Sequence, residues 1–170
     1  QWYKNLVIFL ALFFSGNLFS VELIYLSVLG FLALCLVSSG NYIFNDLADI
    51  KNDRNHPEKK YRPLAAGKIS PLPAIFLALF LFLLGISLAV WLGTSFLIIV
   101  LIIIILTQTY TFFLKKIVFA DILTIASLFV LRAISGAQMI NVKVSPWLIL
   151  CPFFLSLFLS VGKRYADLSF

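Results

Sequence analysis

The chain has 170 residues, 62% of them hydrophobic and 12% charged, and its formal net charge at pH 7 is +6. Soluble domains carry about 25% charged residues, so this composition excludes an ordinary soluble domain and predicts an integral membrane protein. The basic excess needs no nucleic acid partner, since no nucleic-acid-binding motif accompanies it. The two cysteines, Cys35 and Cys151, lie far apart in apolar runs and indicate neither a disulfide framework nor a metal site.

Six apolar segments approach the length of about 20 residues that a helix needs to cross a bilayer. Tight breaks containing glycine, serine, asparagine or paired lysines separate most of them. We therefore predict an all-α fold, a multi-span transmembrane helical bundle. The predicted spans are residues 5–20, 23–44, 71–92, 96–114, 117–140 and 145–162.

A polar stretch, residues 41–70, interrupts this apolar chain after the second predicted span. Asn41, Asn45, Asp49 and Asp53 recur in it every four residues. If the helix continues through them, their side chains lie along one slowly drifting face. Clustered carboxylates repel one another unless a cation lies among them, and Mg²⁺ takes oxygen ligands and shares its shell with substrate phosphates. We predict that Asn45, Asp49 and Asp53 bind Mg²⁺ and take part in catalysis.

The polar stretch becomes strongly basic after its acidic residues. Three consecutive residues there are predicted to bind a substrate: Lys60, Tyr61 and Arg62. The two cations among them suit the phosphates of a diphosphate beside a metal site. The alternative interpretation is a solvated loop whose charges only orient the protein. His56 precedes Pro57 and is expected to be a turn residue rather than a general base.

The string NDLADIKNDRNHPEKKYRPLAAG resembles the first aspartate-rich motif of the UbiA-type intramembrane prenyltransferase superfamily. Its residues His56, Lys60, Arg62 and the run Ala65-Ala66-Gly67 resemble most closely the polyprenyl-phosphate phosphoribosyltransferase branch. The segments YTFFLKK, DILTIASLFVLRAISG, SPWLIL and GKRYADL extend this resemblance over nearly all of the chain after Gln1. Family members have more than six spans, so the resemblance implies that residues 1–170 are one UbiA-like transmembrane domain that lacks its natural N-terminus and its last helices.

The resemblance also implies a reaction, the Mg²⁺-dependent transfer of 5-phosphoribose from phosphoribosyl pyrophosphate to a polyprenyl (decaprenyl) phosphate, with release of pyrophosphate. Typical members of the superfamily carry a second aspartate-rich motif after the sixth span, where this chain has Lys163 and Arg164. Asp167 stands where the phosphoribosyltransferase branch usually has glutamate. Lys163, Arg164 and Asp167 are therefore expected to contact substrate, and the alternative is a basic flank that only orients the protein.

Two other functions are weighed against this one. An aromatic polyprenyltransferase of the same superfamily would use a prenyl diphosphate, and it predicts the second acidic cluster that this sequence lacks. A membrane transporter with an ion path predicts acidic residues within the spans rather than at their mouth.

Arg132 lies in the middle of a predicted span, where an arginine costs about 2.5 kcal/mol or more, so it should face the bundle interior. It is predicted to bind an anionic substrate, with a structural contact to a carbonyl of a neighbouring helix as the alternative. Asp121 shares its helix face but lies about 16 Å away by helical rise.

Basic residues predict the orientation in the membrane. If six helices alternate in direction, Lys143 lies on one side, and the basic residues of the 41–70 stretch, with Lys163 and Arg164, lie on the other. The positive-inside rule places the basic side in the cytoplasm. We expect a multi-pass protein of the cell membrane with a cytoplasmic active site; the sequence specifies no oligomeric state.

Overall fold

The computed structural model describes residues 2–168, and their side chains except at positions 116, 118 and 163–168. Within these residues all regular structure is helical, which confirms the predicted all-α fold. The segments are, in chain order, the 3₁₀-helix η1 (Trp2–Phe9), α1 (Leu10–Phe14), α2 (Val21–Arg54), the 3₁₀-helix η2 (Lys59–Tyr61), α3 (Pro71–Leu92), α4 (Thr94–Phe112), the 3₁₀-helix η3 (Leu114–Lys116), α5 (Val118–Met139) and α6 (Pro146–Leu168).

Five of the six predicted spans each correspond to one helix, and the first, residues 5–20, corresponds to η1, α1 and the turn after them. Four helices, α2, α3, α4 and α5, are long and apolar enough to cross a membrane. The two outer segments, η1 with α1 and the apolar part of α6, are shorter apolar helices. The chain therefore has the helices of a multi-pass membrane protein.

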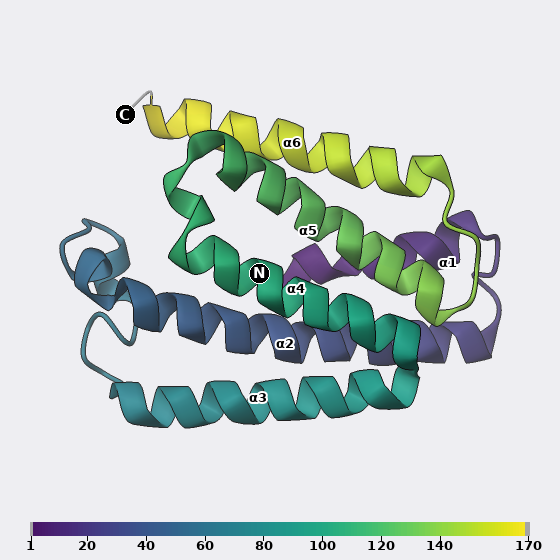
Figure 1. The fold of residues 1–170 in the computed structure, drawn as a ribbon, viewed down its shortest axis with the longest axis horizontal. Helices are drawn as coiled ribbons and strands as arrows, with labels where there is room; N and C mark the ends of the chain where they lie inside the picture. The colour runs from purple at the N-terminus through teal and green to yellow at the C-terminus, as the bar shows by residue number, and fades with distance from the viewer. Residues whose placement is uncertain (1, 169–170) are drawn as a thin grey trace.

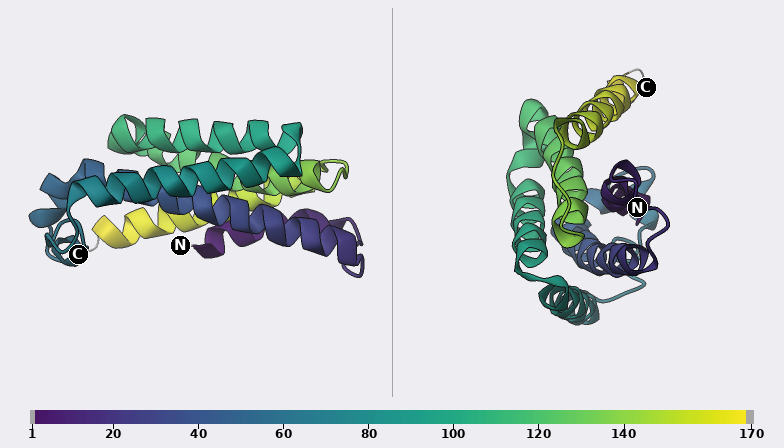
Figure 2. Two further views of the ribbon diagram at one scale, coloured as in Figure 1. Left: turned by 90° about the horizontal axis from the view of Figure 1, so that it is seen from below. Right: turned by 90° about the vertical axis from the view of Figure 1, so that its right-hand side faces the viewer.

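Consecutive helices pack side by side, α2 on α3, α3 on α4, α4 on α5 and α5 on α6 (Figure 1). Seen along the helices, α3, α4, α5 and α6 follow one another around a curve (Figure 2, right). The N-terminal segment η1 lies against both α2 and α5. Helices α2 and α4 are also in contact, and this contact brings two polar segments distant in sequence together.

Glycine allows the closest helix approaches in this bundle. A Cβ atom at Gly136 of α5 would clash with the backbone carbonyl of Ile8 in η1. A Cβ at Gly85 of α3 would lie 2.7 Å from Cγ2 of Val37 in α2. Small residues at such contacts let membrane helices pack backbone to backbone. These contacts bring η1 close to α5 and α3 close to α2.

Helix α2 is 34 residues long, far more than the roughly 20 that cross a bilayer. Its first turn is capped by Ser20, whose side chain accepts a hydrogen bond from the Leu23 backbone N–H. Its last turns carry the polar stretch, so the predicted continuation of the helix through Asp53 is confirmed. The chain then turns at His56, whose Nδ1 accepts the backbone N–H groups of Glu58 and Lys59, as expected of a turn residue.

Candidate active site

The polar stripe of α2 faces two different neighbours. An α-helix turns by about 100° per residue, so a four-residue step advances the stripe by about 40° around the helix. Over the three steps from Asn41 to Asp53 the stripe therefore moves about a third of the way around α2. Its beginning faces α4, and its end faces the segment that connects η2 to α3.

Three polar side chains from α4 and η3 bond to the α4-facing part of the stripe. Gln108 and Thr111 are three residues apart on one face of α4, and Lys115 follows four residues later in η3. The pairs are Gln108 Nε2 to Asn41 Oδ1 (2.7 Å), Thr111 Oγ1 to Asn45 Oδ1 (3.3 Å) and Lys115 Nζ to Asp49 Oδ1 (2.6 Å). Sequence analysis did not name these partners. The signal that could have found Gln108 and Thr111 is the polar run TQTYT within an otherwise apolar span.

Arg62 holds the other part of the stripe. Its Nη1 atom lies 2.9 Å from Asp46 Oδ1 and 2.9 Å from Asp53 Oδ2. Asp53 is buried, with 4% of its surface exposed, whereas Asp46 and Arg62 are half-buried. Two carboxylates seven residues apart on α2 thus converge on one positively charged nitrogen. Asp46 was not among the predicted ligands, although it belongs to the same acidic cluster.

Lys60 and Tyr61 are exposed beside this cluster. The Lys60 ammonium lies 5.2 Å from the centre of the Tyr61 ring, within the range of a cation–π contact. The structure therefore does not bring these two predicted substrate-binding residues into contact with the acidic side chains. The side chains of Lys163, Arg164 and Asp167 lie outside the described residues.

Arg132 faces the bundle interior, as expected, and its surface is 7% exposed. Its Nε donates to Asn5 Oδ1 (2.9 Å) and its Nη1 donates to the Leu128 carbonyl (2.8 Å). The carbonyl belongs to its own helix, and the neighbouring segment η1 supplies an amide side chain instead. Asn5 is also bonded to Ser38 and to Cys35 on α2. These contacts link η1, α2 and α5.

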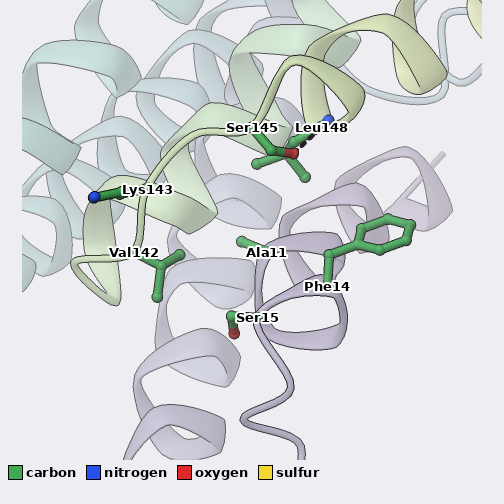
Figure 3. A pocket seen from close by; sticks show the side chains of 7 residues that line it. All are labelled: Ala11, Phe14, Ser15, Val142, Lys143, Ser145 and Leu148. Atoms are coloured by element: carbon green, nitrogen blue, oxygen red, sulfur yellow. Dashed lines mark hydrogen bonds between the residues drawn. The ribbon is translucent and has the colours of Figure 1, made fainter.

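A shallow pocket lies at the other end of the molecule from the acidic residues. Figure 3 shows it between the end of α1 and the connection from α5 to α6, with Phe14, Ser15 and Lys143 in its lining. The polar end of α2 lies at the opposite end of the bundle (Figure 1). This pocket is therefore not part of the candidate active site.

Residues 5–167 match the UbiA prenyltransferase family. The chain belongs to this family.

Three relatives show how the similarity is distributed. The decaprenyl-phosphate phosphoribosyltransferase of Mycolicibacterium smegmatis is 36% identical over 176 residues, covering 99% of this chain and 54% of that protein. The enzyme of the same name from Corynebacterium glutamicum is 33% identical over 172 residues, covering 99% of this chain and 52% of that protein. A digeranylgeranylglyceryl phosphate synthase of Saccharolobus solfataricus is 32% identical over 146 residues, covering 82% of this chain and 50% of that protein.

These matches confirm the resemblance to the UbiA family and to its phosphoribosyltransferase branch. The chain spans about half the length of these three relatives.

UbiA family prenyltransferases generally depend on a divalent metal, and the acidic residues here can be tested against that requirement. Among the side chains that the structure describes, no group of three or more histidine, cysteine, aspartate or glutamate residues is arranged to hold a metal ion. Mg²⁺ seldom needs such a cage, because one or two carboxylates, water and substrate phosphates complete its shell. Asp46 and Asp53 already face one cationic centre, and the Asn45 side chain is hydrogen-bonded to Asp46. This oxygen donor set fits a divalent metal that is shared with a phosphorylated substrate.

Proposed function

We propose that the protein is a polyprenyl-phosphate phosphoribosyltransferase. In this reaction 5-phosphoribose passes from phosphoribosyl pyrophosphate to a polyprenyl phosphate, and pyrophosphate is released. The observation that carries the proposal is the pairing of the three aspartates of α2 with cations from two other segments, Arg62 and Lys115. Acidic and basic groups alternate there at the polar end of an apolar bundle, as a site for a metal-bound diphosphate requires. The two phosphoribosyltransferases at 36% and 33% identity support the choice of donor.

The side chains of the site have distinct roles in this reaction. Asn45, Asp49 and Asp53, with Asp46, would hold Mg²⁺, which when bound neutralises charge that develops on the leaving pyrophosphate. Arg62 and Lys115 lie at the acidic residues and would contact the donor's phosphates. Lys60, Tyr61, Arg132, Lys163, Arg164 and Asp167 are proposed as further substrate contacts.

The bonding changes need no strong general base. The bond between the anomeric carbon of ribose and the pyrophosphate oxygen breaks, and its electron pair leaves with pyrophosphate. A new bond forms between that carbon and an oxygen of the lipid phosphate. The lipid phosphate is already an anion, so no proton has to be removed from it. This agrees with a site built from metal ligands and cations, in which the one histidine of the chain serves a turn.

A second candidate is a prenyltransferase that uses a prenyl diphosphate. The similarity to the digeranylgeranylglyceryl phosphate synthase supports it. The same metal ligands would then neutralise the diphosphate of the prenyl donor. The basic pair Lys163 and Arg164, in the place of a second acidic motif, favours the phosphoribosyl donor.

A comparison of donors distinguishes the two candidates. The purified protein in lipid nanodiscs would receive polyprenyl phosphate and Mg²⁺ with either phosphoribosyl pyrophosphate or a prenyl diphosphate, and pyrophosphate release would be measured. We expect pyrophosphate to be released only when phosphoribosyl pyrophosphate is the donor, and only when polyprenyl phosphate is present as the acceptor. Release from the prenyl diphosphate, with an aromatic or glycerophosphate acceptor, would support the second candidate instead.

We also propose that this site faces the cytoplasm, since basic residues cluster at the polar end of α2. Impermeant thiol reagents can test this orientation after Cys35 and Cys151 have been replaced by serine. A cysteine at Glu58 should react only after cell lysis, and a cysteine at Lys143 should react in intact cells. Both positions are exposed, so each is a matched control for the other. The opposite labelling pattern would contradict the orientation.

A further inference from the structure

Arg62 lies between two carboxylates of the proposed metal site. Its Nη1 atom is 2.9 Å from an oxygen of Asp46 and 2.9 Å from an oxygen of Asp53. A bound Mg²⁺ needs its oxygen ligands at about 2.0–2.1 Å. A metal bound between these same two oxygens would have to displace the nitrogen, because two cations would then compete for one pair of acceptors.

We propose that Arg62 is a placeholder cation of the site. Without substrate it neutralises Asp46 and Asp53, keeps both carboxylates pointing at one centre and opposes the entry of a metal ion alone. When the metal and the diphosphate donor arrive together, the guanidinium exchanges the carboxylates for the donor's phosphate oxygens. This inference rests on the proposed function and adds an order of binding to it, in which the metal enters with the diphosphate.

The surroundings of Arg62 suit such an exchange. Its side chain is 35% exposed, so the guanidinium reaches solvent, whereas the side chain of Asp53 is 6% exposed. The backbone on its C-terminal side is anchored, because Leu64 and Ala65 are each 8% exposed and Arg54 Nε donates to the Ala65 carbonyl (3.3 Å). The head group can therefore change partners while the segment stays in place.

The guanidinium can bind either carboxylate or phosphate, and its exchange between them is favoured only when a diphosphate is present. A guanidinium forms bidentate hydrogen bonds to phosphate as readily as to carboxylate. Buried Asp53 cannot lose its cation without a replacement, since an uncompensated buried charge is strongly unfavourable. The metal replaces the charge at the carboxylates, and the diphosphate receives the displaced guanidinium. The exchange therefore needs both the metal and the diphosphate, because the carboxylates and the guanidinium must each find a new partner of opposite charge.

The placeholder role has a signature that a simple substrate contact lacks. If Arg62 only bound phosphate, its loss would weaken diphosphate binding and leave the affinity for the metal alone unchanged. If it competes with the metal, its loss raises the affinity for the metal alone. The loss of Arg62 also makes pyrophosphate strengthen metal binding by a smaller factor, since coupling between two ligands is reciprocal.

Manganese binding tests this directly, because the electron paramagnetic resonance signal of free Mn²⁺ is lost when the ion binds. The purified protein in nanodiscs would be titrated with Mn²⁺, with and without inorganic pyrophosphate. Arg62→Gln removes the charge but keeps a hydrogen-bond donor for Asp53, and it should bind Mn²⁺ about ten- to a hundredfold more tightly than the wild type without pyrophosphate. Pyrophosphate should raise the Mn²⁺ affinity of the wild type much more than that of Arg62→Gln.

Two variants serve as controls. Lys59→Ala removes a charge from an exposed position three residues away and should change Mn²⁺ affinity less than about twofold. Arg62→Lys keeps the charge and should bind Mn²⁺ as weakly as the wild type. This second variant keeps the test informative if Arg62→Gln does not fold, because tight Mn²⁺ binding by Arg62→Lys would overturn the placeholder role.

Two outcomes separate this inference from the proposed function. Mn²⁺ binding that depends on Asp53 but is equal or weaker in Arg62→Gln would overturn the placeholder role and leave the metal site standing. A failure of the wild type and of every variant to bind Mn²⁺, even with pyrophosphate, would overturn both.

Discussion

Asp53→Asn is expected to lower turnover about 10²- to 10³-fold, the loss typical when one preorganised charge or donor is removed from a site that stabilises developing charge. Asp53 is the most buried carboxylate of the acidic cluster, and it shares Arg62 with Asp46. Asparagine keeps the size of the side chain and removes its charge. The variant should remain folded, because Arg62 retains Asp46 as its partner. Initial rates at saturating donor, lipid and Mg²⁺ would measure the effect.

Glu58→Gln provides the matched control for this prediction. Glu58 is an exposed acid in the segment after α2, so removing its charge should leave turnover nearly unchanged. Equal rates in Asp53→Asn and the wild type would contradict the assignment of Asp53 to the metal site. A similar loss in both variants would indicate an effect of net charge rather than of a particular ligand.

Asn5→Ala is expected to reduce the free energy of unfolding by about 1.5–3 kcal/mol, the range for hydrogen bonds to charged groups. Asn5 is 1% exposed, and its Oδ1 atom accepts hydrogen bonds from Arg132 Nε and Ser38 Oγ. Alanine would leave a buried guanidinium N–H without this acceptor and would loosen the contact of η1 with α2 and α5. Thermal unfolding in detergent, followed by circular dichroism, would report the change.

Asn17→Ala is the control for this substitution, since Asn17 is a half-buried asparagine in the turn after α1 whose side-chain amide donates to Ser15 Oγ within the same turn (3.0 Å). It should change stability little. If Asn5→Ala were as stable as Asn17→Ala but bound the donor more weakly, the cluster around Arg132 would be a substrate contact rather than a structural one. Donor affinity measured beside stability therefore tests the predicted substrate role of Arg132.

The helices were predictable because apolar length alone specifies a membrane span. The predicted spans 71–92 and 117–140 match α3 and α5 to within a residue. The helical extension of α2 through Asp53 followed from the four-residue spacing of its polar residues. These features depend on local sequence, and local sequence was enough to predict them.

The partners of the acidic residues were not predictable in the same way. Lys115 reaches Asp49 because α2 and α4 pack together, and Arg62 reaches Asp46 because the segment after η2 folds back along α2. Both contacts depend on tertiary packing. The drift of a four-residue stripe also explains why the Asn45 and Asp53 side chains contact different neighbours in the structure.

The most direct test of the account follows the fate of the donor's two halves. The purified protein would be incubated with Mg²⁺, polyprenyl phosphate and phosphoribosyl pyrophosphate that carries a radiolabel either in the ribose or in the pyrophosphate. We expect the ribose label to appear in the lipid extract and the pyrophosphate label to remain in the aqueous phase, and we expect the transfer of the ribose label to be lost in Asp53→Asn. Lipid that stays unlabelled by ribose in the wild type, or lipid that acquires the pyrophosphate label, would contradict phosphoribosyl transfer at this site.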